Sequence, residues 1–252
     1  MVFVTGDTHA DFRRFGVKHF PEQKTMTRDD TVIVTGDFGI WHDTPEERYW
    51  LDWLADKPFT IAFVDGNHEN FDRLYSNEFP IVDFHEAKAH AIRENILHIC
   101  RGETMTLEGK TFFCFGGASS HDIDDGIIDP AKFDTPDAFK SAVKAARKTR
   151  KRFRILGQSW WPQEMPSQGE MAHGIANLKK RDFHVDYVIT HCLPQDAALM
   201  LGMHGADPLT MYFNQLIHDG LKFTKWHGGH YHVEQAVFGK FVVHYENIRR
   251  IL

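Results

Sequence analysis

The chain has 252 residues, of which 42% are hydrophobic, and a formal net charge of −6 at pH 7. This length allows one large domain or two small ones with a sizeable buried core, and the acidic balance gives no general reason to expect nucleic-acid binding. The chain has no secretory-signal pattern, no apolar run long enough for a bilayer and no metal-finger spacing among its three cysteines, so we expect a cytoplasmic protein without disulfides.

Apolar runs in the first third of the chain each end in a polar or glycine-rich turn, which predicts buried strands that lead into loops. These runs span residues 2–7, 32–37 and 61–68. A helix is predicted over residues 45–57, because Thr44, Pro45 and Glu47 match an N-cap, a first helical residue and a capping-box acid. The strand, helix, strand order predicts a parallel sheet whose working residues lie at the carboxyl ends of its strands.

The middle of the chain has a different pattern of predicted secondary structure from the first third. Short strand-like pieces joined by tight turns over residues 96–118 are typical of antiparallel β structure and predict a second sheet. Over about residues 119–181 the strand pattern gives way to a polar loop, a helix at about 136–152, a tryptophan-rich turn and a helix capped by Ser167 and Glu170. We expect this segment to be an inserted helical and loop cap over the sheet edges.

The end of the chain returns to strands, at residues 187–191 and 223–230, followed by a short hairpin around Gly239 and Lys240. No shift in composition separates an independent second domain. We therefore expect residues 1–252 to form a single α/β domain that carries the insertion.

The turns after these strands carry side chains that can bind metal ions. The set comprises Asp7, His9, Asp37, Asn67, His68, His191, His230 and His232. For either of the first two turns alone, ordinary turn chemistry is the stronger interpretation, and a single histidine is more often a surface or core residue than a ligand. Five histidines at strand exits, with carboxylates and an amide oxygen beside them, favour a metal site.

The chemistry of this set indicates the kind of metal site. Imidazoles, carboxylates and an amide oxygen without thiolates suit manganese, iron or zinc in sites that keep positions open for water, and they argue against a closed structural zinc site. Even without His68, the other seven residues of the set are too many ligands for one catalytic ion. They suit two ions about 3.5–4 Å apart, which can clamp the attacking and leaving oxygens of a phosphoryl group.

The motifs GDTH, GDFG, GNHE, TH and GGHYH follow one another from Gly6 to His232, nearly the whole chain. In this order they resemble the signature of the calcineurin-like metallophosphoesterases. The resemblance implies a four-layer α/β/β/α sandwich of two mixed sheets flanked by helices. It also implies a hydrolase that contains two divalent metal ions, for which manganese is the preferred expectation and iron and zinc are the alternatives.

The resemblance further implies a role for each residue of the set. The first ion would be held by Asp7, His9 and His232, both ions would be bridged by Asp37, and the second would be held by Asn67, His191 and His230. His68 would not bind metal but would donate a proton to the leaving-group oxygen, for which an imidazole titrating near neutrality is well matched. A water between the two ions would lose its proton near neutral pH and attack as a bridging hydroxide.

The second motif departs from that of the protein serine/threonine phosphatases, which resemble this chain in GNHE. Those enzymes carry an aspartate and then an arginine shortly after the bridging aspartate, where this chain has Ile40 and Trp41. The arginine that would bind a phosphate is therefore missing, and so is the acid that would orient His68. Candidates for the second role, which the sequence does not separate, are Glu69, Asp11 and Asp43.

Substrate contacts are expected from the insertion. His121 and Asp122 follow a predicted strand end, and with Trp41 they are candidate substrate-binding residues. For the tryptophans of the insertion, anchoring the segment to the core is the stronger interpretation, because aromatic side chains bury large areas. The basic run over residues 140–154 is more often a solvated helix face than a nucleic-acid contact, so nucleic acid is not the favoured partner.

These observations predict a cytoplasmic phosphoesterase that acts on a small phosphate ester, with phosphodiesters or nucleotides favoured over phosphoproteins. A phosphomonoesterase or a dinucleotide polyphosphate hydrolase is the alternative within the enzymes. A scaffold that has lost catalysis and serves as an interaction module is less favoured, because every expected metal ligand and the expected catalytic histidine are kept. We expect no membrane partner, and the sequence predicts no oligomeric state.

Overall fold

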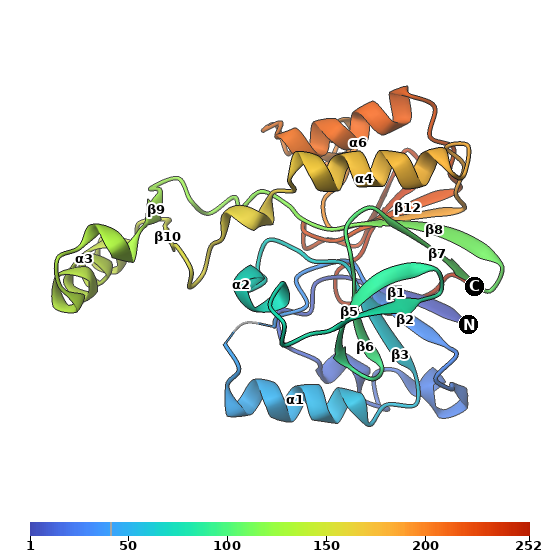
Figure 1. The fold of residues 1–252 in the computed structure, drawn as a ribbon, viewed down its shortest axis with the longest axis horizontal. Coiled ribbons are helices and arrows are strands. Elements are labelled where there is room, and N and C mark those ends of the chain that lie inside the picture. Colours follow the sequence, from blue (N-terminus) through green and yellow to red (C-terminus); the bar gives the residue numbers. More distant parts are fainter. Residues whose placement is uncertain (41) are drawn as a thin grey trace.

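The computed structural model describes residues 1–40 and 42–252. In this part of the chain two large β-sheets stack face to face, and helices cover their outer faces (Figure 1). Helix α1 (Pro45–Ala55) lies on the outer face of the first sheet, whereas α4 (Gln168–Lys179) and α6 (Pro208–His218) lie on that of the second. This arrangement is the predicted four-layer α/β/β/α sandwich.

Hydrophobic side chains fill the spaces between these layers. In the first strand, Val2 and Val4 belong to the cluster between the two sheets, whereas Phe3 belongs to the cluster that also contains Leu51 and Leu54 of α1. A further cluster packs the second sheet against α4 and α6. Because successive strand residues face opposite sides, one apolar run contributes to two cores at once.

The first sheet follows the strand order β15-β1-β2-β3-β6-β5-β4. Its strands are β1 (Val2–Thr5), β2 (Thr31–Val34), β3 (Thr60–Phe63), β4 (Ile81–Phe84), β5 (Ala87–Arg93), β6 (Ile96–Ile99) and β15 (Arg249–Arg250). β1, β2, β3 and β6 are parallel neighbours, which confirms the predicted parallel sheet. The connection from β1 to β2 contains short 3-10 helices, η1 (Arg13–Phe15) and η2 (Pro21–Thr25), and α1 connects β2 to β3.

The second sheet follows the order β13-β14-β12-β11-β8-β7. Its strands are β7 (Glu103–Leu107), β8 (Lys110–Phe115), β11 (Tyr187–Thr190), β12 (Lys225–Gly228), β13 (Gln235–Val237) and β14 (Phe241–Val243). β8, β11, β12 and β14 are parallel neighbours. β13 and β14 form the predicted hairpin.

The prediction for residues 96–118 was correct for part of the segment. β7 and β8 form an antiparallel pair in the second sheet, but β6 belongs to the first sheet, where it pairs with β3 and β5. The chain therefore crosses from one sheet to the other between β6 and β7. An apolar strand pattern indicates that both faces are buried but does not indicate the strand with which it pairs.

The helices α1 and α4 begin where their predicted capping residues place them. The hydroxyl of Thr44 accepts a hydrogen bond from the amide of Glu47 at 3.1 Å, and Ser167 and Glu170 form a complete capping box. Helix α3 (Pro136–Lys148) ends before residue 152, because the Thr149 hydroxyl bonds to carbonyl oxygens of its last turn. The remaining short helices are α2 (Phe71–Leu74), α5 (Gln195–Leu199), η3 (Pro130–Lys132) and η4 (Pro162–Glu164). No helix in the described part of the chain is long and apolar enough to cross a membrane.

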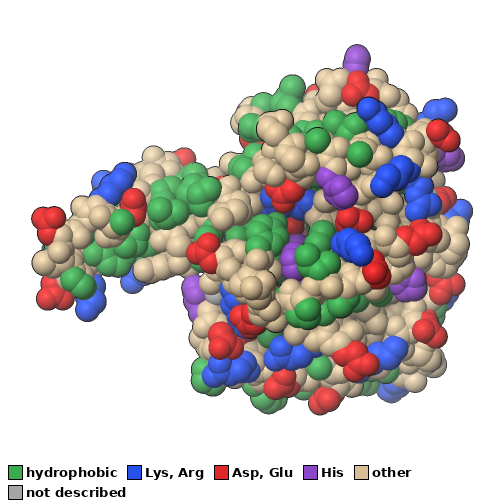
Figure 2. All heavy atoms as spheres, viewed as in Figure 1, with side chains coloured by type: hydrophobic (Ala, Val, Ile, Leu, Met, Phe, Trp, Pro, Cys, Tyr) green, Lys and Arg blue, Asp and Glu red, His purple; other side chains and the backbone are tan. Residues whose placement is uncertain are grey.

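The predicted insertion has two differently placed parts. α3 and the short parallel strands β9 (Ile127–Ile128) and β10 (Arg154–Ile155) form an arm that extends away from the body, as Figures 1 and 2 show. At the root of the arm, Trp161 is buried in the core of the first sheet and its indole donates to Asp72 at 2.7 Å. α4 instead packs on the second sheet. The single-domain boundary over residues 1–252 stays a prediction.

Two histidines are buried in the second sheet. His227 on β12 and His244 after β14 share a contact of 2.8 Å between Nδ1 and Nε2, and within the described residues the other ring nitrogen of each has no hydrogen-bond partner. Burial lowers the pKa of His227 to about 3 and that of His244 to about 4. Both rings are therefore neutral in the folded protein near neutral pH.

These two histidines should make the fold sensitive to acid. Their pKa values in the unfolded chain are about 6.5, so their contribution to stability is complete above that pH and is lost as the pH falls toward 4. Urea denaturation of the wild type and of His227→Gln should give free energies of unfolding that fall more steeply with acid in the wild type. Equal slopes would contradict this explanation.

Candidate metal centre

The predicted ligands meet where the carboxyl ends of parallel strands from both sheets face one another. Asp7 and His9 follow β1, Asp37 follows β2, Asn67 and His68 follow β3, His191 follows β11, and His230 and His232 follow β12. Parallel strands of one sheet place their exits at one edge. Stacking two such sheets brings exits that are more than 150 residues apart in sequence into one site, as with the 2.7 Å contact from His191 Nδ1 to the Thr35 carbonyl oxygen.

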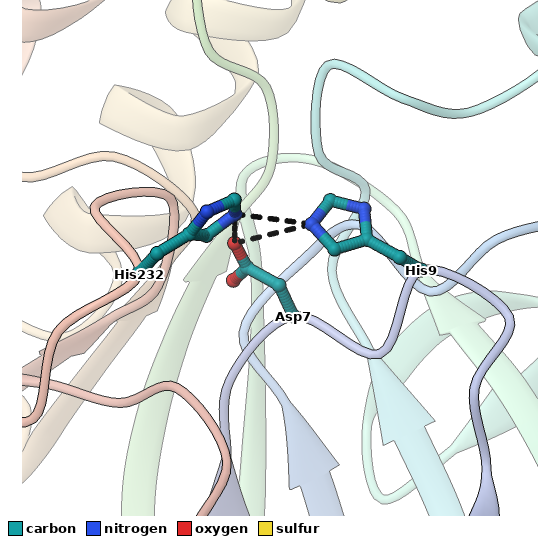
Figure 3. A group of neighbouring side chains, drawn as sticks. All are labelled: Asp7, His9 and His232. Atoms are coloured by element: carbon teal, nitrogen blue, oxygen red, sulfur yellow. Dashed lines mark hydrogen bonds and ion pairs between the residues drawn. The ribbon is translucent and has the colours of Figure 1, made fainter.

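A first group of side chains consists of Asp7, His9 and His232 (Figure 3). Nε2 of His232 lies 3.2 Å from Oδ2 of Asp7 and 3.1 Å from Nε2 of His9, and the His9 nitrogen is 3.9 Å from the same carboxylate oxygen. One oxygen and two imidazole nitrogens therefore face a common point. The group can supply three ligands to one divalent ion.

A second group centres on His191. Its Nε2 atom lies 3.4 Å from Oδ2 of Asp37 and 3.3 Å from Oδ1 of Asn67. The same Asp37 oxygen is 3.7 Å from Nδ1 of His9, which belongs to the first group. Asp37 thus lies between the two groups, where a carboxylate could be shared by two ions.

His230 lies beside this second group. Its backbone amide donates to both carboxylate oxygens of Asp7, at 3.0 and 3.1 Å, and its ring packs edge-on against His191 with centroids 4.9 Å apart. Nε2 of His230 is 2.6 Å from Nε2 of His121. The structure therefore places His121, a predicted substrate-binding residue, in direct contact with a predicted ligand.

The electrostatics of the site require positive charge. Asp7 and His191 are 0% exposed and Asp37 is 1% exposed. Burial alone would lower the pKa of His191, but the charges of Asp37 and Asp7 raise it to about 10. Burial alone would raise the pKa of Asp37, but His191, His68 and His9 hold it far below its usual range. Buried carboxylates and imidazoles arranged in this way fit bound divalent cations, which would replace the proton.

The backbone around the ligands is held in conformations that cost free energy. His9, Asp37, His230 and His232 have φ angles of 44°, 47°, 70° and 52°, in the left-handed region. Such residues cost about 1–3 kcal/mol each and persist where the surroundings hold them in place. Gly66 permits a close approach at the same site, because a Cβ atom there would lie 2.0 Å from Oδ1 of Asp37.

A buried chain of hydrogen bonds orients Asn67. Its amide Nδ2 donates to the hydroxyl of Ser120 at 3.2 Å, and this hydroxyl donates to Glu164 at 2.6 Å. The amide nitrogen is thereby turned away from His191 and the amide oxygen toward it. Neither Ser120 nor Glu164 was predicted from the sequence, because their partner is more than 40 residues away; the nearest signal was the neighbouring His121.

His68 lies beside the two groups without joining them. Its backbone amide donates to Oδ1 of Asp37 at 2.9 Å, and its ring packs edge-on against His9 with centroids 5.4 Å apart. Nε2 of His68 is 3.3 Å from Nη2 of Arg154, which in turn pairs with Asp122. Burial lowers the pKa of His68, Asp37 raises it, and Arg154 lowers it further. Asp122, a predicted substrate-binding residue, therefore reaches the site through Arg154.

The three acids considered for orienting His68 have other partners. Glu69 accepts hydrogen bonds from the backbone amides of Phe38, Gly39 and Ile40, Asp11 pairs with Arg13, and Asp43 pairs with Arg48 and Arg73. Glu69 thus fixes the loop that follows Asp37. Trp41, the remaining predicted substrate-binding residue, lies outside the described residues.

The chain is similar to a known protein family over most of its length. The family model described as calcineurin-like phosphoesterase matches residues 1–237. Phosphopantetheinyl hydrolase from Mycobacterium tuberculosis is 17% identical with a TM-score of 0.45, over 97% of this chain and 89% of the other. The protein of unknown function AQ665 from Aquifex aeolicus is 18% identical with a TM-score of 0.26, over 65% of this chain and 81% of the other. No curated protein matches the chain.

The hydrogen-bond chain through Ser120 predicts a selective effect on metal binding. In Ser120→Ala, Asn67 loses the partner that orients its amide, so affinity for an ion in the second group should fall by about 10- to 100-fold. The first group should keep its affinity, because it does not contact Ser120. Calorimetric titration with Mn²⁺ measures both, and Ser141→Ala on the exposed side of α3 is the control. Unchanged affinity at both groups would contradict the role of the hydroxyl.

Proposed function

The chain belongs to the calcineurin-like phosphoesterases, and from this premise we propose that it hydrolyses phosphate esters with two divalent metal ions. The observation that supports this most is the position of Asp37 between two groups of ligands. Its carboxylate oxygen lies 3.4 Å from His191 and 3.7 Å from His9. A single shared carboxylate is what a pair of neighbouring ions needs.

Each ion would have its own set of side chains. The first would be held by Asp7, His9 and His232, which lie within reach of one ion. The second would be held by Asn67, His191 and His230, with Asp37 shared by both; Asn67 and the ring of His230 both contact His191. Manganese is the proposed metal, with iron and zinc as alternatives, because the set holds nitrogen and oxygen donors without thiolates. When bound, the ions would activate a water molecule and neutralise the charge of the phosphate oxygens.

The protein's own residues supply orientation and a proton. The bond from the His68 amide to Asp37 fixes His68 beside the ligand groups, and its half-buried ring lines a neighbouring cavity. In the proposed reaction the bond from phosphorus to the leaving oxygen breaks, and His68 donates a proton to that oxygen. The hydrogen bond from His191 Nδ1 to the Thr35 carbonyl leaves Nε2 as the ligand atom.

Small phosphodiesters or nucleotides are the proposed substrates. The arginine and aspartate of the protein-phosphatase motif are absent from the GDFG block of the sequence, which argues against phosphoproteins. A phosphomonoesterase or a dinucleotide polyphosphate hydrolase is the second candidate within the family. The cytoplasm remains the proposed compartment, on the basis of the cysteine pattern.

Replacing His68 tests the catalytic role directly. His68→Ala should keep its bound metal, because His68 belongs to neither ligand group, and should lose about 10²- to 10⁴-fold in turnover through loss of the proton donor. Elemental analysis and steady-state kinetics measure the two quantities. His218→Ala, which removes an exposed histidine on α6, is the control. Equal turnover in the variant and the wild type would refute the assigned role.

A panel of esters tests the proposed substrate class. With Mn²⁺ present, the wild type should hydrolyse bis-p-nitrophenyl phosphate or a cyclic nucleotide faster than p-nitrophenyl phosphate. Turnover of the monoester alone would exclude the diesterase preference, and preferred turnover of a dinucleotide polyphosphate would support the second candidate. A lack of turnover with every member would favour an interaction module on this scaffold.

A further inference from the structure

Arg154 enters the site from the root of the arm. It lies on β10, and its Nη2 atom is 3.3 Å from Nε2 of His68. The side chain is 21% exposed, so it is largely but not fully withdrawn from solvent. Because a guanidinium can only donate, Nε2 of His68 is the acceptor in this contact. The insertion therefore delivers an arginine to the imidazole that would protonate the leaving oxygen.

Asp122 holds this arginine in place. Oδ1 of Asp122 accepts from Nε of Arg154 at 2.9 Å, and Oδ2 lies 2.5 Å from Nη2. A two-point pair of this kind fixes the plane of the guanidinium. Since a guanidinium has more donors than one carboxylate can use, the remaining donors of Arg154 are available to a second anion.

A small cavity adjoins Arg154 and His68. It has a volume of about 160 Å³ and is lined by His42, His68, Arg154, Gln158, Ser159 and Trp161. Trp161 is 4% exposed and its indole is bonded to Asp72, so this wall of the cavity is rigid. A cavity of roughly 150 Å³ can accommodate one six-membered ring.

From these observations we infer that Arg154 binds a non-bridging oxygen of the substrate phosphate and that this cavity receives the leaving alcohol, which has the size of one ring. The inference rests on the proposed function. The phosphate-binding arginine that is missing after Asp37 would thus be supplied by the arm. The oxygen of water forms the new bond to phosphorus as the bond from phosphorus to the leaving oxygen breaks. The leaving oxygen takes the proton from His68, and the ring-bearing group departs as an alcohol.

Binding of a non-hydrolysable probe tests Arg154 apart from turnover. Calorimetry should show that phenylphosphonate binds the Mn²⁺-loaded wild type about 10- to 100-fold more tightly than Arg154→Ala, because a charge-assisted hydrogen bond is lost. Arg147→Ala, at an exposed position in the last turn of α3, should bind as the wild type does. Arg154→Lys should give an intermediate affinity. Thermal unfolding and metal content, measured on each variant, identify any loss of fold.

Kinetics with p-nitrophenyl esters provide a second readout. In Arg154→Ala, kcat/KM should fall mainly because KM rises. Added guanidinium should lower KM part of the way back. Equal affinity and equal KM in a folded Arg154→Ala variant would overturn the inference while wild-type turnover still supported the proposed function. If the wild type neither bound the phosphonate nor hydrolysed any ester, the proposed function would fail and the inference with it.

The cavity itself is tested by filling it. Gln158→Trp should weaken binding of phenylphosphonate but leave binding of methylphosphonate unchanged, since only the ring needs the cavity. The wild type should prefer the phenyl compound. Unchanged affinity of this variant for both compounds would overturn the assignment of the cavity to the leaving group.

Discussion

Asp7 and Asp37 place two carboxylates, almost without solvent exposure, at the edge where the two sheets meet. Burying a carboxylate is costly unless hydrogen bonds and opposite charge compensate it. The amides of His230 and His68 supply hydrogen bonds, and the imidazole of His191 supplies charge. Further positive charge is still needed at this edge, and the proposed metal ions would supply it.

The two stacked sheets hold these buried side chains close together, although the connecting loops take unfavourable backbone conformations. Each candidate ligand follows a strand whose position is fixed by apolar layers on both faces, so the loops cannot move apart without breaking a core. Several candidate ligands, including His9 and Asp37, have left-handed backbone conformations, which cost free energy. The arm is built differently. It projects from the body (Figure 1), is anchored by Trp161, and brings Arg154 into contact with His68.

Sequence patterns predicted the parts of this molecule that are local. Thr44 and Ser167 mark helix starts because a cap is satisfied within one turn. The motifs place the candidate ligands at strand ends because each motif directly follows a strand. Pairing partners were not predictable in this way. β6 joined the first sheet, and the contacts of Ser120 and Arg154 with the site span 53 and 86 residues. Local patterns carry no information about such contacts.

The most direct test of the two-ion account is anomalous diffraction from crystals of the Mn²⁺-loaded protein. Two anomalous peaks are expected if the protein binds two ions. One should lie among Asp7, His9 and His232, the other beside His191 and Asn67, with Asp37 in contact with both. A single peak, or two peaks without a shared carboxylate, would contradict it.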